Sequence, residues 1–98
     1  MTGASAPGAT KTVSVADDYF EPSSLTIKEG NTVEFTWVGE NVHNVTKSDD
    51  SPGRYFDSGA SDETGFVYPH KFKKPGRYEI LCTLHDEMRM DLRVKRKR

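Results

Sequence analysis

Nine consecutive residues near the carboxyl end of the chain place a thiol, an imidazole and two thioethers close together. They read Cys82-Thr83-Leu84-His85-Asp86-Glu87-Met88-Arg89-Met90 and begin where one expected strand ends. A loop at a strand end can curl its side chains around one point. Thiolate, imidazole and thioether are soft ligands that suit copper, and two His, one Cys and a weak axial Met are the set found in copper sites for electron transfer. The segment therefore predicts a copper site.

A second histidine is needed to complete this ligand set. The residues offer two candidates, His43 within Asn41-Val42-His43-Asn44-Val45-Thr46 and His70 within Tyr68-Pro69-His70-Lys71-Phe72. His43 lies just past an expected strand that ends near Val38, whereas His70 lies among aromatic residues and lysines. Residue types alone do not choose between them.

The same Cys–His pair allows a catalytic interpretation, in which a thiol is the nucleophile and an imidazole the base. Cys82 and His85 are only three positions apart on one loop, however, and the neighbouring thioethers favour a metal. A closed site with four protein ligands leaves no open position for a substrate. We therefore expect that the protein is not an enzyme.

The length, charge and composition of the chain argue against several other classes of protein. A chain of 98 residues indicates one domain. The net charge is -1, but the last four of the fourteen basic residues form the run Lys95 to Arg98, so the rest of the chain carries ten basic against fifteen acidic residues. An acidic body argues against nucleic-acid binding. No run approaches the roughly 18 apolar residues of a membrane span, and the single cysteine excludes an intrachain disulfide.

Apolar and polar residues alternate with a period of two over several short stretches, which predicts strands with one buried face. The apolar members are Val13 and Val15, Leu25 and Ile27, Val33, Phe35 and Trp37, Tyr78, Ile80 and Cys82, and Leu92 and Val94. Glu29-Gly30-Asn31 and Pro75-Gly76 are turn signals. Without a helical pattern, these strands predict an all-β sandwich or barrel. We expect a flexible linker over 1–10, a domain over 11–95 and a basic tail over 96–98, with a long polar connection over 47–65.

Taken in order, three segments make the chain resemble a cupredoxin of the plastocyanin, amicyanin and halocyanin kind. They are Phe20-Glu21-Pro22-Ser23-Ser24-Leu25-Thr26-Ile27-Lys28-Glu29-Gly30, Val42-His43-Asn44-Val45 and Pro75-Gly76-Arg77-Tyr78-Glu79-Ile80-Leu81-Cys82. The resemblance runs from about Val13 to Val94. It implies a Greek-key sandwich of about eight strands with one type 1 copper at one end. It also selects His43, not His70, as the second imidazole ligand.

The resemblance further implies which residues surround the ligands. The backbone N–H of Asn44 would reach the Cys82 sulfur, and the Asn44 side chain would tie the two ligand segments together near Thr83. Relatives often have proline where this chain has Leu84, so the Leu84 N–H offers the sulfur a second hydrogen bond. For the axial ligand we favour Met88 over Met90, because Leu92 and Val94 then stand at the positions where relatives have core residues.

The function implied is electron transfer by a single blue copper that cycles between Cu(I) and Cu(II). Copper storage or delivery on the same fold is the alternative, and a sandwich that binds a partner without metal is a third hypothesis. Redox protein partners would dock near His85 on a monomer, and Asp86 and Glu87 favour a basic partner. The resemblance also implies a periplasmic or other extracytoplasmic location.

Overall fold

The computed structural model describes residues 9–97, so most of the predicted linker and the last residue of the predicted tail lie outside the described part. These residues contain strands and no helix, as the alternation predicts. The strands are β1 (Thr10–Val15), β2 (Phe20–Glu21), β3 (Ser24–Lys28), β4 (Thr32–Trp37), β5 (Thr46–Lys47), β6 (Val67–Lys71), β7 (Gly76–Cys82) and β8 (His85–Lys95). Because residues 9–97 form no helix, they contain none that is long and apolar enough to cross a membrane.

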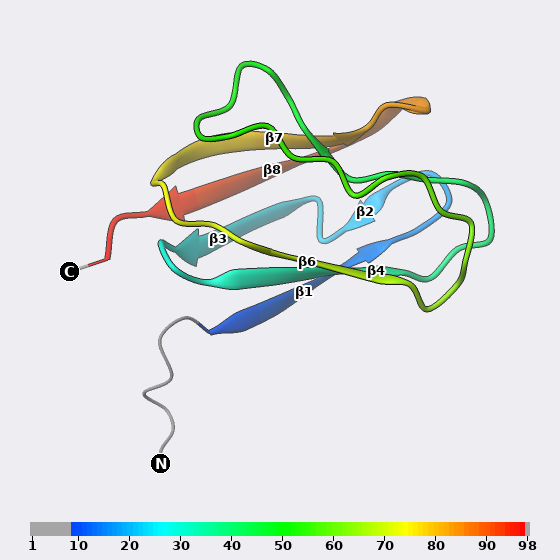
Figure 1. Ribbon diagram of the computed structural model, residues 1–98, viewed down its shortest axis with the longest axis horizontal. Coiled ribbons are helices and arrows are strands. Elements are labelled where there is room, and N and C mark those ends of the chain that lie inside the picture. Colours follow the sequence, from blue (N-terminus) through cyan, green and yellow to red (C-terminus); the bar gives the residue numbers. More distant parts are fainter. Residues whose placement is uncertain (1–8, 98) are drawn as a thin grey trace, which may run out of the picture.

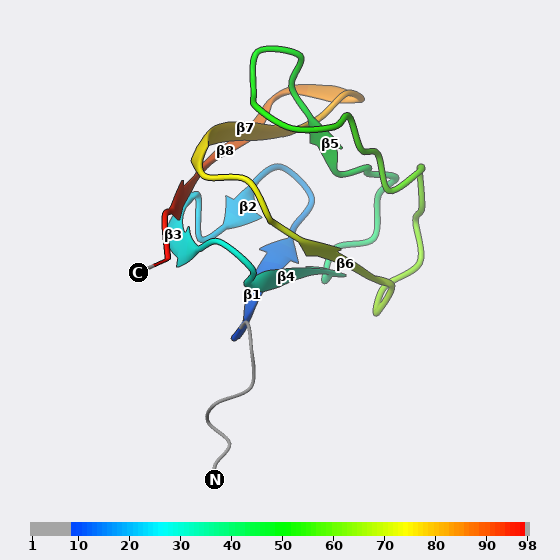
Figure 2. The ribbon, with the colours of Figure 1, turned by 60° about the vertical axis from the view of Figure 1, so that its left-hand side comes forward.

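The strands form two four-stranded sheets that pack as a sandwich (Figure 2). One sheet has the order β2-β1-β4-β6 and the other has the order β3-β8-β7-β5. The pairs β1–β4 and β3–β8 are parallel, and the remaining pairs are antiparallel. The predicted all-β sandwich of about eight strands is confirmed.

Alternate side chains of the strands fill the space between the sheets. In β4, Val33, Phe35 and Trp37 are buried to 1% exposure or less, while their neighbours are partly exposed. The indole N–H of Trp37 donates to the carbonyl oxygen of Ser61 at 2.9 Å, which satisfies the one polar group that this ring brings into the core. Cys82 is the last inward-facing residue of β7, so the strand itself delivers the thiol to one end of the core.

The segment that follows Cys82 differs from the predicted loop. Residues 83 and 84 form a tight turn, and β8 already begins at His85, which pairs with Cys82. The next pair along the hairpin is Leu81 with Arg89, so three residues of β8 have no partner on β7. The side chains that the sequence places on a loop therefore lie on a bulged strand, whose extra residues bend it locally. This bulge lies at the end of the sandwich opposite the end where β1 begins and β8 stops (Figure 1).

The long connection between β5 and β6 is anchored at two points along its course. Phe56 packs into the core, whereas its neighbour Tyr55 is 61% exposed. Ser61 forms an isolated bridge with His43, in which each backbone N–H donates to the other residue's carbonyl at 3.0 Å. The connection therefore holds the backbone of His43 in place.

Candidate metal centre

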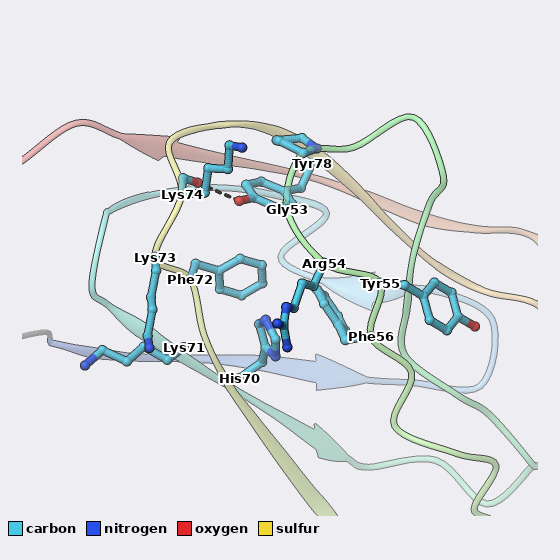
Figure 3. A pocket seen from close by; sticks show the side chains of 11 residues that line it. Gly53, Arg54, Tyr55, Phe56, His70, Lys71, Phe72, Lys73, Lys74 and Tyr78 are labelled. Carbon is cyan, nitrogen blue, oxygen red and sulfur yellow. Dashed lines mark hydrogen bonds between the residues drawn. The ribbon is translucent and has the colours of Figure 1, made fainter.

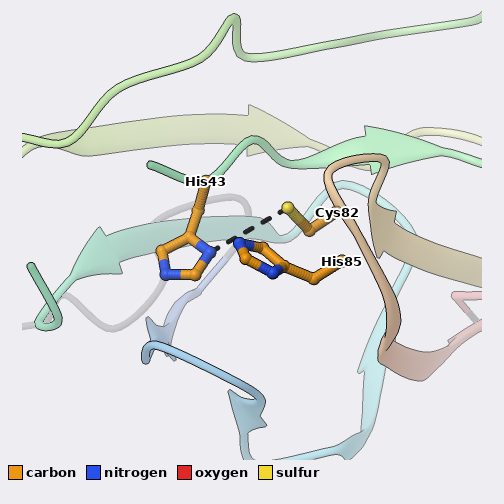
Figure 4. Close-up of side chains that lie close together, drawn as sticks. All are labelled: His43, Cys82 and His85. Atoms are coloured by element: carbon orange, nitrogen blue, oxygen red, sulfur yellow. Dashed lines mark hydrogen bonds between the residues drawn. The ribbon is translucent and has the colours of Figure 1, made fainter. Parts of the chain in front are cut away.

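Two separate parts of the chain bring three donor side chains together at this end of the sandwich. His43 comes from the segment after β4, and Cys82 and His85 come from the two sides of the β7–β8 turn. Their ligand atoms all lie within 4.8 Å of one another. Figure 4 shows the His43 ring facing the Cys82 sulfur, with Nδ1 at 3.9 Å from Sγ, and the His85 ring beside them. His43 and Cys82 are fully buried and His85 is partly exposed.

His70 is not part of this cluster. It lies on β6 and stacks on Phe56 with ring centroids 3.9 Å apart. Figure 3 shows His70 with Phe56 and Phe72 in the lining of a different cavity, whose volume is about 290 Å³. Burial of the ring lowers the pKa of His70, which keeps it neutral at physiological pH. His70 is an aromatic packing residue, and of the two candidate histidines the donor cluster contains His43.

The acceptors beside the two rings indicate which nitrogen of each neutral ring is the hydrogen-bond donor. Nε2 of His43 lies 3.2 Å from a carboxylate oxygen of Asp17, and Nε2 of His85 lies 3.2 Å from the carbonyl oxygen of Val42. Both oxygens only accept hydrogen bonds, so each Nε2 is the donor and each Nδ1 keeps a free lone pair. Two free imidazole lone pairs and a buried thiol form a soft donor set that fits copper.

Asn44 joins the two segments that carry these donors. Its backbone N–H donates to Sγ of Cys82 at 3.5 Å. Its side-chain amide donates to Thr83 Oγ1 at 2.7 Å, and its side-chain oxygen accepts the Thr83 N–H at 3.0 Å and the Thr46 hydroxyl at 3.0 Å. These are the contacts expected of Asn44 and Thr83. Because Asn44 is buried and uses most of its hydrogen-bonding groups, it braces the segment of the first imidazole against the end of β7 that bears the sulfur.

Leu84 does not make its expected contact. Among the hydrogen bonds of residues 9–97, the Cys82 sulfur has the Asn44 N–H and the His43 ring as partners, and the Leu84 N–H does not reach it. The physical reason is the tight turn, in which Cys82 pairs directly with His85 and Leu84 lies at the tip with its side chain 51% exposed. Within the described part of the chain, the sulfur therefore has no second backbone N–H as a partner, and leucine at this position adds apolar surface beside His85.

The two methionines lie on the same face of β8, as strand parity predicts. Met88, Met90, Leu92 and Val94 are all buried, whereas the residues between them are exposed. Met90 pairs with Ile80, which lies two positions before Cys82, or roughly 7 Å along a strand that rises about 3.3 Å per residue. Met88 lies within the bulge, between that position and the Cys82–His85 pair. The register therefore brings Met88 nearer than Met90 to the donor cluster.

Sequence reasoning missed one residue at this site. Asp17, in the turn between β1 and β2, binds the His43 ring although 26 positions separate the two residues. The backbone N–H of Asn41 and then the His43 ring hold the pKa of Asp17 below its ordinary value, because they stabilise the charged carboxylate. Two adjacent aspartates in a turn look like a solvated loop, so no local signal distinguishes Asp17 from Asp18.

Comparisons with known proteins agree with the fold and the donor set. Residues 9–96 match the model of a family described as copper binding proteins, plastocyanin/azurin family. A plastocyanin of Dryopteris crassirhizoma is 32% identical over 82 residues, which cover 72% of this chain and 80% of that protein. A mutant of amicyanin in its oxidised state matches with a TM-score of 0.78 and 27% identity, over 90% of this chain and 83% of that chain.

A copper-containing nitrite reductase from Thermus scotoductus SA-01 also matches, with a TM-score of 0.77 and 28% identity. The match covers 91% of this chain but only 23% of the reductase chain. The chain therefore spans about a quarter of that enzyme, and the similarity concerns one domain-sized part of it.

Proposed function

Because the chain belongs to the plastocyanin/azurin family of copper-binding proteins, we propose that it carries single electrons by means of one type 1 copper. The proposed ligands are Nδ1 of His43, Sγ of Cys82, Nδ1 of His85 and the thioether of Met88. Bound copper supplies a one-electron couple between Cu(I) and Cu(II). The chain's own residues supply the position, the burial and the hydrogen bonds of the ligands.

The observation that carries the proposal is that three donor side chains converge at one end of the sandwich and are braced there. Their ligand atoms lie within 4.8 Å of one another, and the Asn44 hydrogen bonds brace the two segments that bear them. An electron carrier works fast when little moves as the metal changes its oxidation state. A braced donor set between two sheets meets this requirement, whereas a delivery protein must release its metal to a partner.

Reversible redox cycling of the copper-loaded protein tests this function. We expect one Cu(II) to bind per chain, to give an intense visible band, and to survive repeated chemical reduction and reoxidation with the same amplitude. A storage or delivery protein would hold one oxidation state and lose the other to a competing chelator during the cycles. A protein that bound no copper would remove the proposal altogether.

The electron would leave through His85, which is the partly exposed member of the donor cluster. Its neighbour Leu84 is 51% exposed, and Val42, whose carbonyl accepts the His85 N–H, is 44% exposed. Glu40 and Glu87 are exposed near this apolar pair in the sequence. We propose that a redox partner docks here with an apolar contact at its centre and basic groups at its rim, because such groups match the acidic side chains.

Charge removal beside His85 should slow association with a basic partner. In the variant that combines Asp86→Asn with Glu87→Gln, we expect the association rate at low salt to fall several-fold and its salt dependence to flatten, because electrostatic steering weakens. Stopped-flow electron transfer with a basic redox protein measures both quantities.

A matched variant removes the same charge elsewhere. Glu29→Gln with Asp91→Asn changes the β3–β4 turn and the middle of β8, away from the turn that bears His85. We expect this variant to keep the rate much closer to that of the unmodified protein. Equal effects of the two double variants would mean that net charge alone matters and that this surface is not the docking site.

The remaining assignments are also proposals. We propose that residues 11–95 form the copper domain, with 1–10 as linker and 96–98 as tail, and that the protein works as a monomer outside the cytoplasm, which the likeness to plastocyanin and amicyanin supports. We propose no enzymatic activity, since the matched part of the nitrite reductase is a minor share of that chain.

A further inference from the structure

One carboxylate oxygen of Asp17 binds three groups of the segment that carries the first imidazole. Oδ1 accepts the backbone N–H of Glu40 at 2.8 Å, the backbone N–H of Asn41 at 2.9 Å and Nε2–H of His43 at 3.2 Å. The side chain of Asp17 is 40% exposed, whereas that of His43 is fully buried. The carboxylate therefore links the surface turn between β1 and β2 to Nε2 of a buried ring.

The backbone opposite Asp17 is shaped for this close approach. A side chain at Gly39 would collide with the carboxylate and with the backbone nitrogen of Asp17. Gly39 is also held on both sides, since its N–H donates to the Val15 carbonyl at 3.4 Å and its own carbonyl accepts the Thr64 hydroxyl at 2.6 Å. Because Gly39 has no side chain, the Asp17 carboxylate can pass close to the backbone at this position and contact the His43 ring.

The consequence for His43 follows from the chemistry of imidazole. A neutral ring carries its proton on either nitrogen, and only the nitrogen without the proton can bind a metal. An ionised carboxylate accepts hydrogen bonds and donates none, so it holds the proton on Nε2. The lone pair then remains on Nδ1, which already faces the Cys82 sulfur at 3.9 Å.

We propose that Asp17 is a positioning residue for the copper centre, which sets the tautomer of His43 and strengthens its Nδ1 as a donor. A negative charge on the far side of the ring increases the electron density that the imidazole gives to the metal. Stronger donation favours Cu(II) over Cu(I), so Asp17 lowers the reduction potential. This inference rests on the proposed role of His43 as a ligand.

Two substitutions separate the geometric part of this role from the charge. Asp17→Asn keeps an oxygen that can accept the same three N–H groups but removes the negative charge. Asp17→Ala removes both the oxygen and the charge. Asp18→Asn is the matched control, because Asp18 is the adjacent exposed carboxylate and its side chain makes no hydrogen bond among the described residues.

The tautomer is read in the copper-free protein by nitrogen NMR of the histidine rings, so this arm does not depend on redox function. We expect the proton of His43 on Nε2 in the unmodified protein, in Asp17→Asn and in Asp18→Asn, and a mixture of both tautomers in Asp17→Ala. An unchanged His43 tautomer in a folded Asp17→Ala would show that other contacts set it and would overturn the positioning role.

The charge effect is read in the copper-loaded protein. In Asp17→Asn we expect Cu(II) affinity to fall roughly ten- to hundredfold, as is typical when a partner of a metal-bound imidazole is lost, and the reduction potential to rise above that of Asp18→Asn. Equal potentials in the two Asn variants would overturn the donor-strengthening role, and this comparison remains available if Asp17→Ala does not fold. If the protein bound no copper, the proposed function would fail while the tautomer result still stood.

Discussion

Cys82→Ser should abolish the visible colour of the copper-loaded protein. The colour of the proposed centre arises from charge transfer between a thiolate and Cu(II), and Cys82 is the only cysteine in the chain. A serine hydroxyl has a hard oxygen donor and stays protonated at neutral pH, so it cannot replace the soft, charged sulfur. We expect loss of the whole intense band, measured by visible spectroscopy after addition of one equivalent of Cu(II).

Folding must be checked in parallel, because Cys82 is fully buried and a buried hydroxyl without a good partner costs about 1–3 kcal/mol. The nearby Asn44 N–H offers the new hydroxyl one partner, so we expect the variant to fold with lowered stability in thermal denaturation followed by circular dichroism. His70→Gln is a control that removes an imidazole outside the donor cluster and should leave the colour intact. A folded Cys82→Ser variant that stayed blue would place the copper elsewhere.

Met88→Leu should raise the reduction potential and change the copper spectrum, whereas Met90→Leu should do neither. Both methionines are buried at 2% exposure or less, so each exchange conserves volume within the core and should cost less than about 1.5 kcal/mol. The difference between the two variants therefore reports ligation and not packing. Loss of a thioether donor disfavours Cu(II), which has the greater need for electron density, and this raises the potential.

Voltammetry and visible spectroscopy of the two variants, side by side, measure this difference. Thermal denaturation of the copper-free forms should show similar small losses of stability, because both side chains belong to the same buried face of β8. If Met90→Leu shifted the potential while Met88→Leu left it unchanged, the axial ligand would be Met90 and the bulge in β8 would have to place it closer to Cys82 than the register indicates.

The strands β1, β3, β4, β7 and β8 were predictable from the sequence, because one buried face imposes a period of two on each of them. Val33, Phe35 and Trp37 show this most clearly, and all three are core residues of β4. Alternation did not predict the other three strands, because β2 and β5 have only two residues each and β6 has no buried residue. The Cys82-to-Met90 segment was recognisable for a different reason, since soft donors rarely gather in nine residues without a metal to bind. Both features depend only on residues that are close together in the chain, so they can be recognised in a single sequence.

The conformation of the β7–β8 turn could not be predicted from local sequence patterns. The sequence predicted a loop after Cys82 because the expected strand ends there, but the hairpin closes over two residues and β8 begins at His85. Whether residues 85–88 are loop or bulged strand depends on their pairing across the sheet. Pairing is set by the register of the whole hairpin, which aligns Tyr78 with Leu92 and Ile80 with Met90 in the core.

By itself, the sequence determined that this chain has the donor types of a copper site and the alternation of a β-sandwich. Residue types could not choose between His43 and His70, and only the resemblance favoured His43. In the folded chain, the segment of His43 leads into β5, which pairs with β7 in the same sheet, whereas His70 lies on β6 of the other sheet. The tautomer of His43, its contact with Asp17 and the absence of a Leu84 hydrogen bond on sulfur were likewise decided by tertiary structure. The first two depend on atoms that are distant in sequence and lie within about 4 Å of one another. The third depends on the geometry of one turn. A linear sequence pattern does not contain these distances.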